Sequence, residues 1–168
     1  MPSAFTNPNI RERVATNTAT GYYADDHTDP ASFIEGTVQW RVGERVLTFL
    51  VLVVKRGPNG LAVRGAVRGG EFFDAMWAHF AAVGTVVDVI QAEWTTVPLS
   101  PTATFTTNLD GFNAAVLVHP TLEAAALHGT PTSSFARRKG YTGVTVVQAL
   151  PPSQAGPFDE VIVQFRRH

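Results

Sequence analysis

The chain has 168 residues, of which 45% are apolar and 16% charged, and its formal net charge is −1. This length is sufficient for one globular domain with a sizeable core, and the near-zero charge excludes a strong positive field over the whole surface. Because there is no cysteine, disulfides, thiolate metal sites and a cysteine nucleophile are excluded. The basic residues gather late in the chain, in "ARRKG" and "QFRRH", which leaves room for a local basic patch.

Residues 1–31 are polar and rich in turn-forming residues, so we expect an N-terminal arm with one short helix near residues 10–15. The start has no apolar segment of the kind found in secretory signals, which predicts a cytoplasmic protein, or one delivered to other cells if it is part of a larger toxin. The longest apolar run, "VLTFLVLVV", is much shorter than the about 20 residues of a membrane helix. This run is better interpreted as a buried strand.

Residues 32–168 are expected to form a single domain. Strands are predicted over 33–42 and 45–57, joined at Gly43 and Glu44 by a two-residue type II′ turn. A third strand over 61–68 is weakened by its glycines. A helix over 71–83, ended by Gly84, and a strand over 85–94 follow.

A threonine- and proline-rich loop over 95–106 precedes three predicted helices. The first opens at Asn108 with a capping box of Thr107 and Asp110, and the others lie in "PTLEAAALHG" and "PTSSFARRKG". Two closing strands, 143–150 and 158–165, are expected to pair. The predicted fold class is therefore α+β, with a mixed, mostly antiparallel sheet of five to six strands packed against three to four short helices.

His79 interrupts the apolar stripe of the helix over 71–83. Phe72, Met76 and Val83 lie within the same arc of the helix, so the histidine is not on its solvent side. One interpretation is a core histidine that is satisfied by a buried partner. The other is a general acid or base in a pocket.

Asn113 interrupts the next helix in the same way, since Leu109, Phe112 and Val116 complete its apolar face. A buried amide must place two donors and its acceptor sites, so it either holds a neighbouring loop, here 95–106, or contacts a substrate. Asn108 and Asp110 are explained by capping. If His79 and Asn113 face one cavity, they form a polar pair in an apolar pocket, which is typical of a ligand site.

Two further groups are candidates for substrate binding. Arg137 and Arg138 could hold phosphate, although basic residues are also favoured at the end of a helix. Trp77, Trp94 and Phe112 could roof an apolar pocket. The segment "ADDHTD" at 24–29 is interpreted as an acidic turn rather than a metal site, and neither a metal nor a cofactor is predicted. Motifs of common serine hydrolases, zinc proteases and deaminases are absent from the sequence.

Residues 69–166 contain several short motifs in a definite order. "GGEFFDAMWAHF" is followed by a strand that ends at Trp94, then by "TNLDGFN", "HGTPTSSFARRKGY" and "FDEVIVQF". This order resembles the C-terminal domains of bacterial polymorphic toxins and related secreted or phage-associated proteins. The matching positions include the pair His79 and Phe80 and the segment 108–113. The resemblance implies a small bacterial effector-like domain, and it brings no catalytic triad with it.

Three functions follow as hypotheses. The first is a toxin-like domain that acts on nucleic acid or nucleotide, with His79 as acid or base, Asn113 orienting the substrate and Arg137 and Arg138 holding phosphate; such a toxin would have an immunity protein as partner. The second is a stand-alone enzyme or binding protein for an apolar small molecule, of the kind used in secondary metabolism. The third is an interaction module without catalysis.

Overall fold

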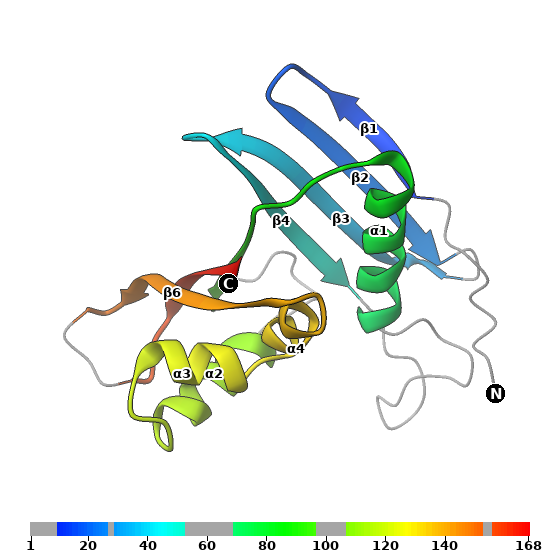
Figure 1. The fold of residues 1–168 in the computed structure, drawn as a ribbon. Helices are drawn as coiled ribbons and strands as arrows, with labels where there is room; N and C mark the ends of the chain where they lie inside the picture. The colour runs from blue at the N-terminus through cyan, green and yellow to red at the C-terminus, as the bar shows by residue number, and fades with distance from the viewer. Residues whose placement is uncertain (1–9, 27–28, 53–68, 97–106, 153–155) are drawn as a thin grey trace. The chain divides into compact units, whose positions relative to one another are not determined.

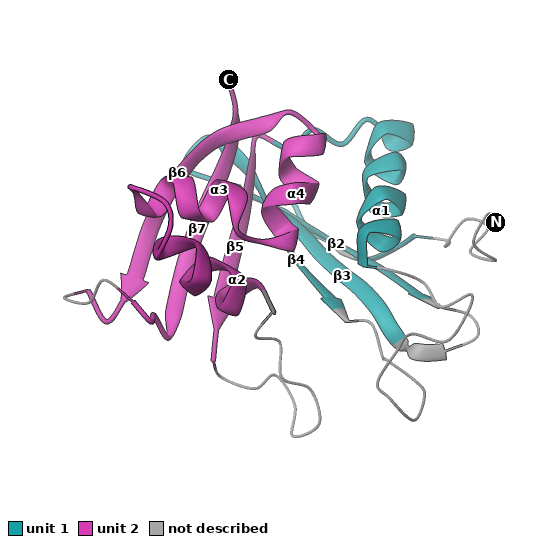
Figure 2. Cartoon of the chain, turned by 90° about the horizontal axis from the view of Figure 1, so that it is seen from below, with its two compact units in different colours: residues 1–87 teal, residues 88–168 magenta. Residues whose placement is uncertain are grey.

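The computed structural model describes residues 10–26, 29–52, 69–96, 107–152 and 156–168 (Figure 1). The chain divides into two compact units, Met1–Val87 and Asp88–His168, which Figure 2 shows in different colours. The first unit contains β1 (Arg11–Ala15), β2 (Ala19–Asp26), β3 (Asp29–Arg41), β4 (Glu44–Leu52) and α1 (Gly69–Val83). The second contains β5 (Val89–Thr95), α2 (Thr107–Val116), α3 (Leu122–His128), α4 (Pro131–Arg138), β6 (Tyr141–Leu150) and β7 (Glu160–Arg167).

The first unit is an antiparallel sheet with the strand order β1-β2-β3-β4, and α1 packs on one of its faces (Figure 1). Side chains alternate between the two faces of a strand, and the even-numbered residues of β3 from Ser32 to Val38 are buried. The helix contributes the buried side chains Phe72, Phe73, Met76 and Phe80. Gly36 permits this close packing, because a Cβ there would lie 2.8 Å from the Met76 sulfur.

The hairpin between β3 and β4 turns at Val42 and Gly43. Arg41 pairs with Glu44, so the two residues between them form the turn, and both have positive φ, 47° and 82°. Positive φ at both central positions defines a type I′ turn. The predicted type II′ turn at Gly43 and Glu44 was therefore wrong by one residue. The reason is that a β-branched residue such as Val42 is strained at positive φ, so its sequence did not suggest this turn.

Helix α1 confirms the predicted helix over 71–83. Gly84 follows it at φ 74°, and the Thr85 N–H donates to the Phe80 carbonyl over 2.9 Å. This six-residue bond and the left-handed glycine form a Schellman motif, which satisfies a carbonyl at the helix end. The predicted stop at Gly84 was correct for this reason.

The second unit is an antiparallel sheet with the order β5-β7-β6, and its three helices pack on one face (Figure 2). Val161, Val163 and Phe165 of β7 are fully buried and pair with Trp94, Ala92 and Ile90 of β5. The alternate positions carry Gln91, Glu93 and Gln164 together with the apolar Val89 and Ile162, so the face away from the helices is the more polar one.

Local signals fix the helices of this unit. Thr121 caps α3 by accepting from the Ala124 N–H, and Thr130 and Ser133 form a reciprocal capping box that opens α4. Both helices lie where the sequence predicted them. Gly111 of α2 meets the backbone carbonyl of Gly129 so closely that a Cβ would overlap it. A glycine inside a helix is explained here by close helix approach.

The α+β fold class is confirmed, with seven strands and four helices among the described residues and antiparallel pairing within each unit. The expected five to six strands are exceeded because β1 and β2 occupy part of the stretch expected to be an arm. The short helix predicted near residues 10–15 is wrong, since β1 lies there. The predicted strand over 61–68 and most of the loop over 95–106 lie outside the described residues. The division into an arm and one domain stays a prediction.

Candidate functional site

The edge strand β1 presents different chemistry on each of its faces. Glu12 pairs with Tyr22 of β2, and Tyr22 is buried on the side that α1 covers. Arg11 pairs with Tyr23, so these two side chains point to the opposite face. The three letters "RER" at residues 11–13 thus place one carboxylate towards α1 and two guanidinium groups away from it.

His79 of α1 lies against the first of these faces. Its ring meets the Tyr22 ring edge-on, with the centroids 5.7 Å apart, and its Nε2 lies 3.8 Å from a carboxylate oxygen of Glu12. The Tyr22 hydroxyl in turn lies 3.2 Å from the Thr85 hydroxyl. The His79 side chain is 22% exposed and that of Glu12 is 47% exposed. An imidazole, a carboxylate and a phenol therefore gather at the edge of the sheet.

The Nε2 atom of His79 is buried from water and has no hydrogen-bond partner among the described residues. The 3.8 Å separation from Glu12 is too long for a hydrogen bond. Buried polar atoms are normally satisfied, and an exception calls for an explanation such as a catalytic role. The described residues therefore do not supply Nε2 with the buried partner that the interpretation of His79 as a core residue expects.

Asn113 has the opposite environment. Its side-chain nitrogen donates to the Phe158 carbonyl over 3.0 Å, and its side-chain oxygen accepts from the Phe158 N–H over 2.7 Å. The amide thus pairs with the backbone of one residue as a neighbouring strand would. It holds the segment that leads into β7. A contact with the loop over 95–106 is not tested, because most of that loop lies outside the described residues. His79 belongs to the first unit and Asn113 to the second, and each has its described partners within its own unit.

The aromatic candidates fall into two clusters. Trp77 stacks on Phe73 with centroids 5.5 Å apart and meets Phe80 edge-on, within α1. In the second unit, Trp94 and Phe112 are both buried, and their centroids lie 5.7 Å apart. The indole nitrogen of Trp94 is buried without a hydrogen-bond partner in the described part of the chain. The structure therefore brings Trp94 and Phe112 together.

Arg137 and Arg138 are exposed at the end of α4, and the Arg138 guanidinium lies 5.5 Å from the Phe135 ring centroid. Asn108 has a role that the sequence did not reveal. Its side-chain oxygen accepts from the Thr132 N–H over 3.0 Å, so it caps α4 rather than its own helix. The capping pair predicted at Thr107 and Asp110 is not tested, because the Thr107 side chain lies outside the described residues.

Tyr141, at the start of β6, is a buried ionisable residue that the sequence analysis did not single out. Burial raises the pKa of its phenol, and the charge of Arg167 and a hydrogen bond with it partly offset this rise. The Arg167 guanidinium carbon lies 4.8 Å from the ring centroid. The arrangement is a structural contact between the ends of β6 and β7.

No three histidine, aspartate or glutamate side chains of the described ranges come together in a way that could hold a metal ion. His27 of the acidic segment at 24–29 lies outside those ranges. No described helix is long and apolar enough to cross a membrane.

Comparison with known proteins brings no further assignment: no family model, curated protein or solved structure matches the chain. The candidate site therefore depends on its own geometry. Glu12 and Tyr22 were missed because they lie far from His79 in sequence, in a stretch expected to be an arm. A detectable signal was the tyrosine pair in "GYYADD", since aromatic residues favour strands.

Proposed function

We propose that the chain is an effector-like enzyme that acts on nucleic acid or nucleotide, with His79 as its general acid and base. The observation that carries this proposal is the buried Nε2 of His79, which has no hydrogen-bond partner among the described residues and lies beside the Glu12 carboxylate. Histidine is the side chain best suited to exchange a proton near neutral pH.

Glu12 has two tasks in this proposal. Its carboxylate stabilises the imidazolium that forms when His79 takes a proton from an attacking hydroxyl or water. Its side chain is also half-exposed, so its movement opens Nε2 to that hydroxyl. His79 then returns the proton to the leaving group. Tyr22, held by its contact with Thr85, sets the ring orientation of His79.

The toxin-like character of the proposal comes from the order of motifs over residues 69–166. His79 and Phe80 belong to those motifs, and Phe80 is buried beside Tyr22 with centroids 4.8 Å apart. We leave Asn113 out of the catalytic set, because its donor and acceptor both serve Phe158. Arg137 and Arg138 are exposed, charged residues of the second unit and remain candidate phosphate-binding residues of that unit by itself.

The test is growth of a bacterial host after tightly controlled induction of the protein. The wild type should stop growth, whereas His79→Gln should be harmless. Glu12→Gln should need about ten times as much protein as the wild type to stop growth. His128→Gln is the matched control, because His128 is an exposed histidine at the end of α3. All variants are first shown to unfold cooperatively. Growth arrest by His79→Gln, or no arrest by the wild type, contradicts the proposal.

A second function is favoured by the indole nitrogen of Trp94, which is buried and has no hydrogen-bond partner in the described part of the chain. A buried donor among the apolar rings of Phe112 and Phe158 is the pattern of a small-molecule site with one orienting polar group. A fluorescence screen of apolar compounds that carry one acceptor tests this alternative. Binding that is lost in Trp94→Phe and kept in Trp77→Phe supports this alternative. Binding that Trp94→Phe leaves unchanged contradicts it.

A further inference from the structure

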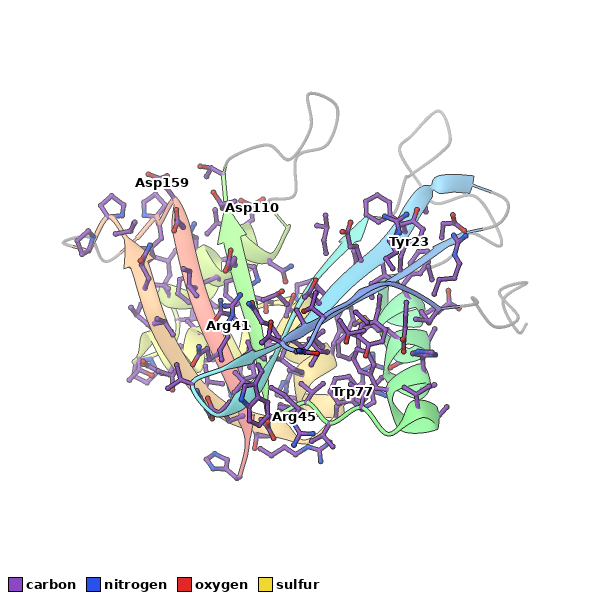
Figure 3. The ribbon with its side chains drawn as sticks, turned by 90° about the horizontal axis from the view of Figure 1, so that it is seen from above. Tyr23, Arg41, Arg45, Trp77, Asp110 and Asp159 are labelled. Carbon is purple, nitrogen blue, oxygen red and sulfur yellow. The ribbon has the colours of Figure 1, made fainter. Side chains whose placement is uncertain are left out.

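The face of the first sheet that points away from α1 carries a row of neighbouring side chains, which we name the arginine–aromatic ladder: Arg11, Arg13, Tyr23 and Phe33. The Arg13 guanidinium carbon lies 3.7 Å above the Tyr23 ring centroid, and that of Arg11 lies 5.5 Å from it. The Tyr23 and Phe33 rings are stacked, with centroids 5.8 Å apart and planes inclined by 26°. Figure 3 shows Tyr23 towards the opposite end of the strands from Arg41 and Arg45.

Arg13 is the residue of the ladder that points to a ligand. Arg11 forms an ion pair with Asp25, whose carboxylate oxygen lies 3.5 Å from a guanidinium nitrogen. Arg13 is exposed and has no carboxylate partner among the described residues. A guanidinium that stacks through its face keeps its N–H donors, which lie in its plane, available for a phosphate. The tyrosine ring holds this charge in one orientation, which lowers the entropy lost on binding.

We propose that the arginine–aromatic ladder binds single-stranded nucleic acid. A base would extend the stack on Arg13 or on the Phe33 end, and the flanking phosphates would accept from Arg13 and Arg11. Single strands are favoured over duplexes, because stacking of this kind needs unpaired bases. The ladder lies on the face opposite to Glu12 and His79, so it is a separate surface and not the catalytic site itself.

The ladder also agrees with the small net charge of the chain. The ladder has two arginines, but Arg11 pairs with Asp25. The exposed Glu35 also lies opposite Tyr23 on the same face, so about one phosphate is neutralised. The logarithm of the affinity should then fall with the logarithm of the salt concentration with a slope of about −1, since each phosphate contributes about −0.7 for single strands. A steep slope would instead indicate a broad basic patch, which a net charge of −1 does not favour.

The proposal shares its substrate class with the proposed function, and the test separates the two. Fluorescence anisotropy is measured on the full chain with labelled single-stranded DNA and RNA of about 12 nucleotides, within the size range of known single-strand sites. Arg13→Ala should weaken binding by about ten-fold and reduce the magnitude of the salt slope by about 0.7. Tyr23→Thr keeps a strand-forming residue and should weaken binding to a similar degree.

Arg13→Lys separates stacking from charge, because lysine keeps the positive charge but lacks the planar guanidinium. We expect its affinity to fall while its salt slope stays at the wild-type value. Arg45→Lys is the matched control, since Arg45 also lies over an aromatic ring, that of Trp40 at 5.4 Å, but pairs with it on the other face of the sheet. Arg45→Lys should bind as the wild type does.

Three results would overturn the inference. The first is no binding to either oligonucleotide, and the second is binding that Arg13→Ala and Tyr23→Thr leave unchanged. The third is an affinity for duplex DNA and heparin equal to that for single strands, together with an unchanged affinity of Arg13→Lys. The last result would indicate a simple polyanion surface. If the wild type binds through Arg13 and Tyr23 but does not stop growth, the catalytic proposal fails while the ladder stands. Growth arrest without oligonucleotide binding contradicts the ladder and leaves the catalytic proposal standing.

Discussion

Asn113 and His79 occupy the same kind of position, a polar residue within the apolar stripe of a helix, and their environments are opposite. Asn113 satisfies its donor and its acceptor on the backbone of Phe158, whereas Nε2 of His79 has no hydrogen-bond partner among the described residues. A primary amide carries a donor and an acceptor side by side, so it matches the N–H and C=O of one residue in an extended segment, and an imidazole cannot. An interrupted stripe alone therefore does not separate a structural residue from a functional one.

Replacement of Asn113 should have the largest effect on stability. Asn113→Ala removes two hydrogen bonds and leaves the N–H and C=O of Phe158 without partners, so the free energy of unfolding should fall by about 3 kcal/mol. Urea unfolding followed by circular dichroism measures this change. Growth arrest and oligonucleotide binding, measured at a temperature where the variant is folded, should be unchanged.

Asp110→Ala is the matched control for this substitution, since Asp110 is an exposed residue of the same helix (Figure 3). It should lower the free energy of unfolding by no more than about 1 kcal/mol, the contribution of an acidic residue in the first turn of a helix. If Asn113→Ala is equally mild, the pairing with Phe158 does not stabilise the fold, and the predicted role in substrate orientation becomes the better explanation of this residue.

Tyr141 extends the comparison to a buried group that can ionise. Burial raises the pKa of its phenol above the value in the unfolded chain, and Arg167 offsets part of this rise. A raised folded-state pKa contributes stability that is present below about pH 10 and is lost as the pH rises through the folded-state value. At pH 8, Tyr141→Phe should be less stable by about 1.5 kcal/mol, because the interaction with Arg167 is lost.

The difference in the free energy of unfolding between wild type and Tyr141→Phe should shrink as the pH rises above 10. The unfolded wild-type chain then ionises this phenol more readily than the folded protein does, and phenylalanine has no proton to lose. Unfolding of both proteins at pH 8 and at alkaline pH measures it, and the titration of lysines and other tyrosines largely cancels in the comparison. A difference that grows with pH would mean that the phenolate is favoured in the fold, and that Arg167 outweighs burial.

Elements with local signals were predictable from the sequence. The helix that became α1 ends where Gly84 allows a left-handed residue, and α3 and α4 begin where Thr121 and Thr130 can cap them. Caps and glycines act within a few residues, so their effect can be read without knowledge of the fold. The antiparallel pairing of β6 and β7 followed from their order along the chain.

The partners of the site residues could not be predicted in this way. Glu12 lies on a polar edge strand, which has no buried run to identify it, and it meets His79 only because β1 pairs with β2 beneath α1. The contact of Asn113 with Phe158 likewise depends on tertiary structure. Similarly, the strained turn at Val42 is imposed by the register of β3 and β4, against the preference of its own residue.

Apart from the control at Asp110, the smallest change in stability is predicted for His79→Phe, and this variant separates His79 from Asn113 most clearly. The nitrogen Nε2 of His79 is buried and has no hydrogen-bond partner within the described ranges. His79→Phe replaces this ring by an apolar one of similar shape, next to Tyr22 and in a helix with three buried phenylalanines. We expect the free energy of unfolding to rise by about 1 kcal/mol at pH 8, because the cost of the unsatisfied nitrogen is removed. A residue whose loss stabilises the protein is retained for a reason other than folding. Growth arrest should disappear in the same variant, while Asn113→Ala should show the reverse pattern of lost stability and kept activity. If His79→Phe is instead destabilised by as much as Asn113→Ala, then the contact with Glu12 is a structural one, and both interrupted stripes serve the fold alone.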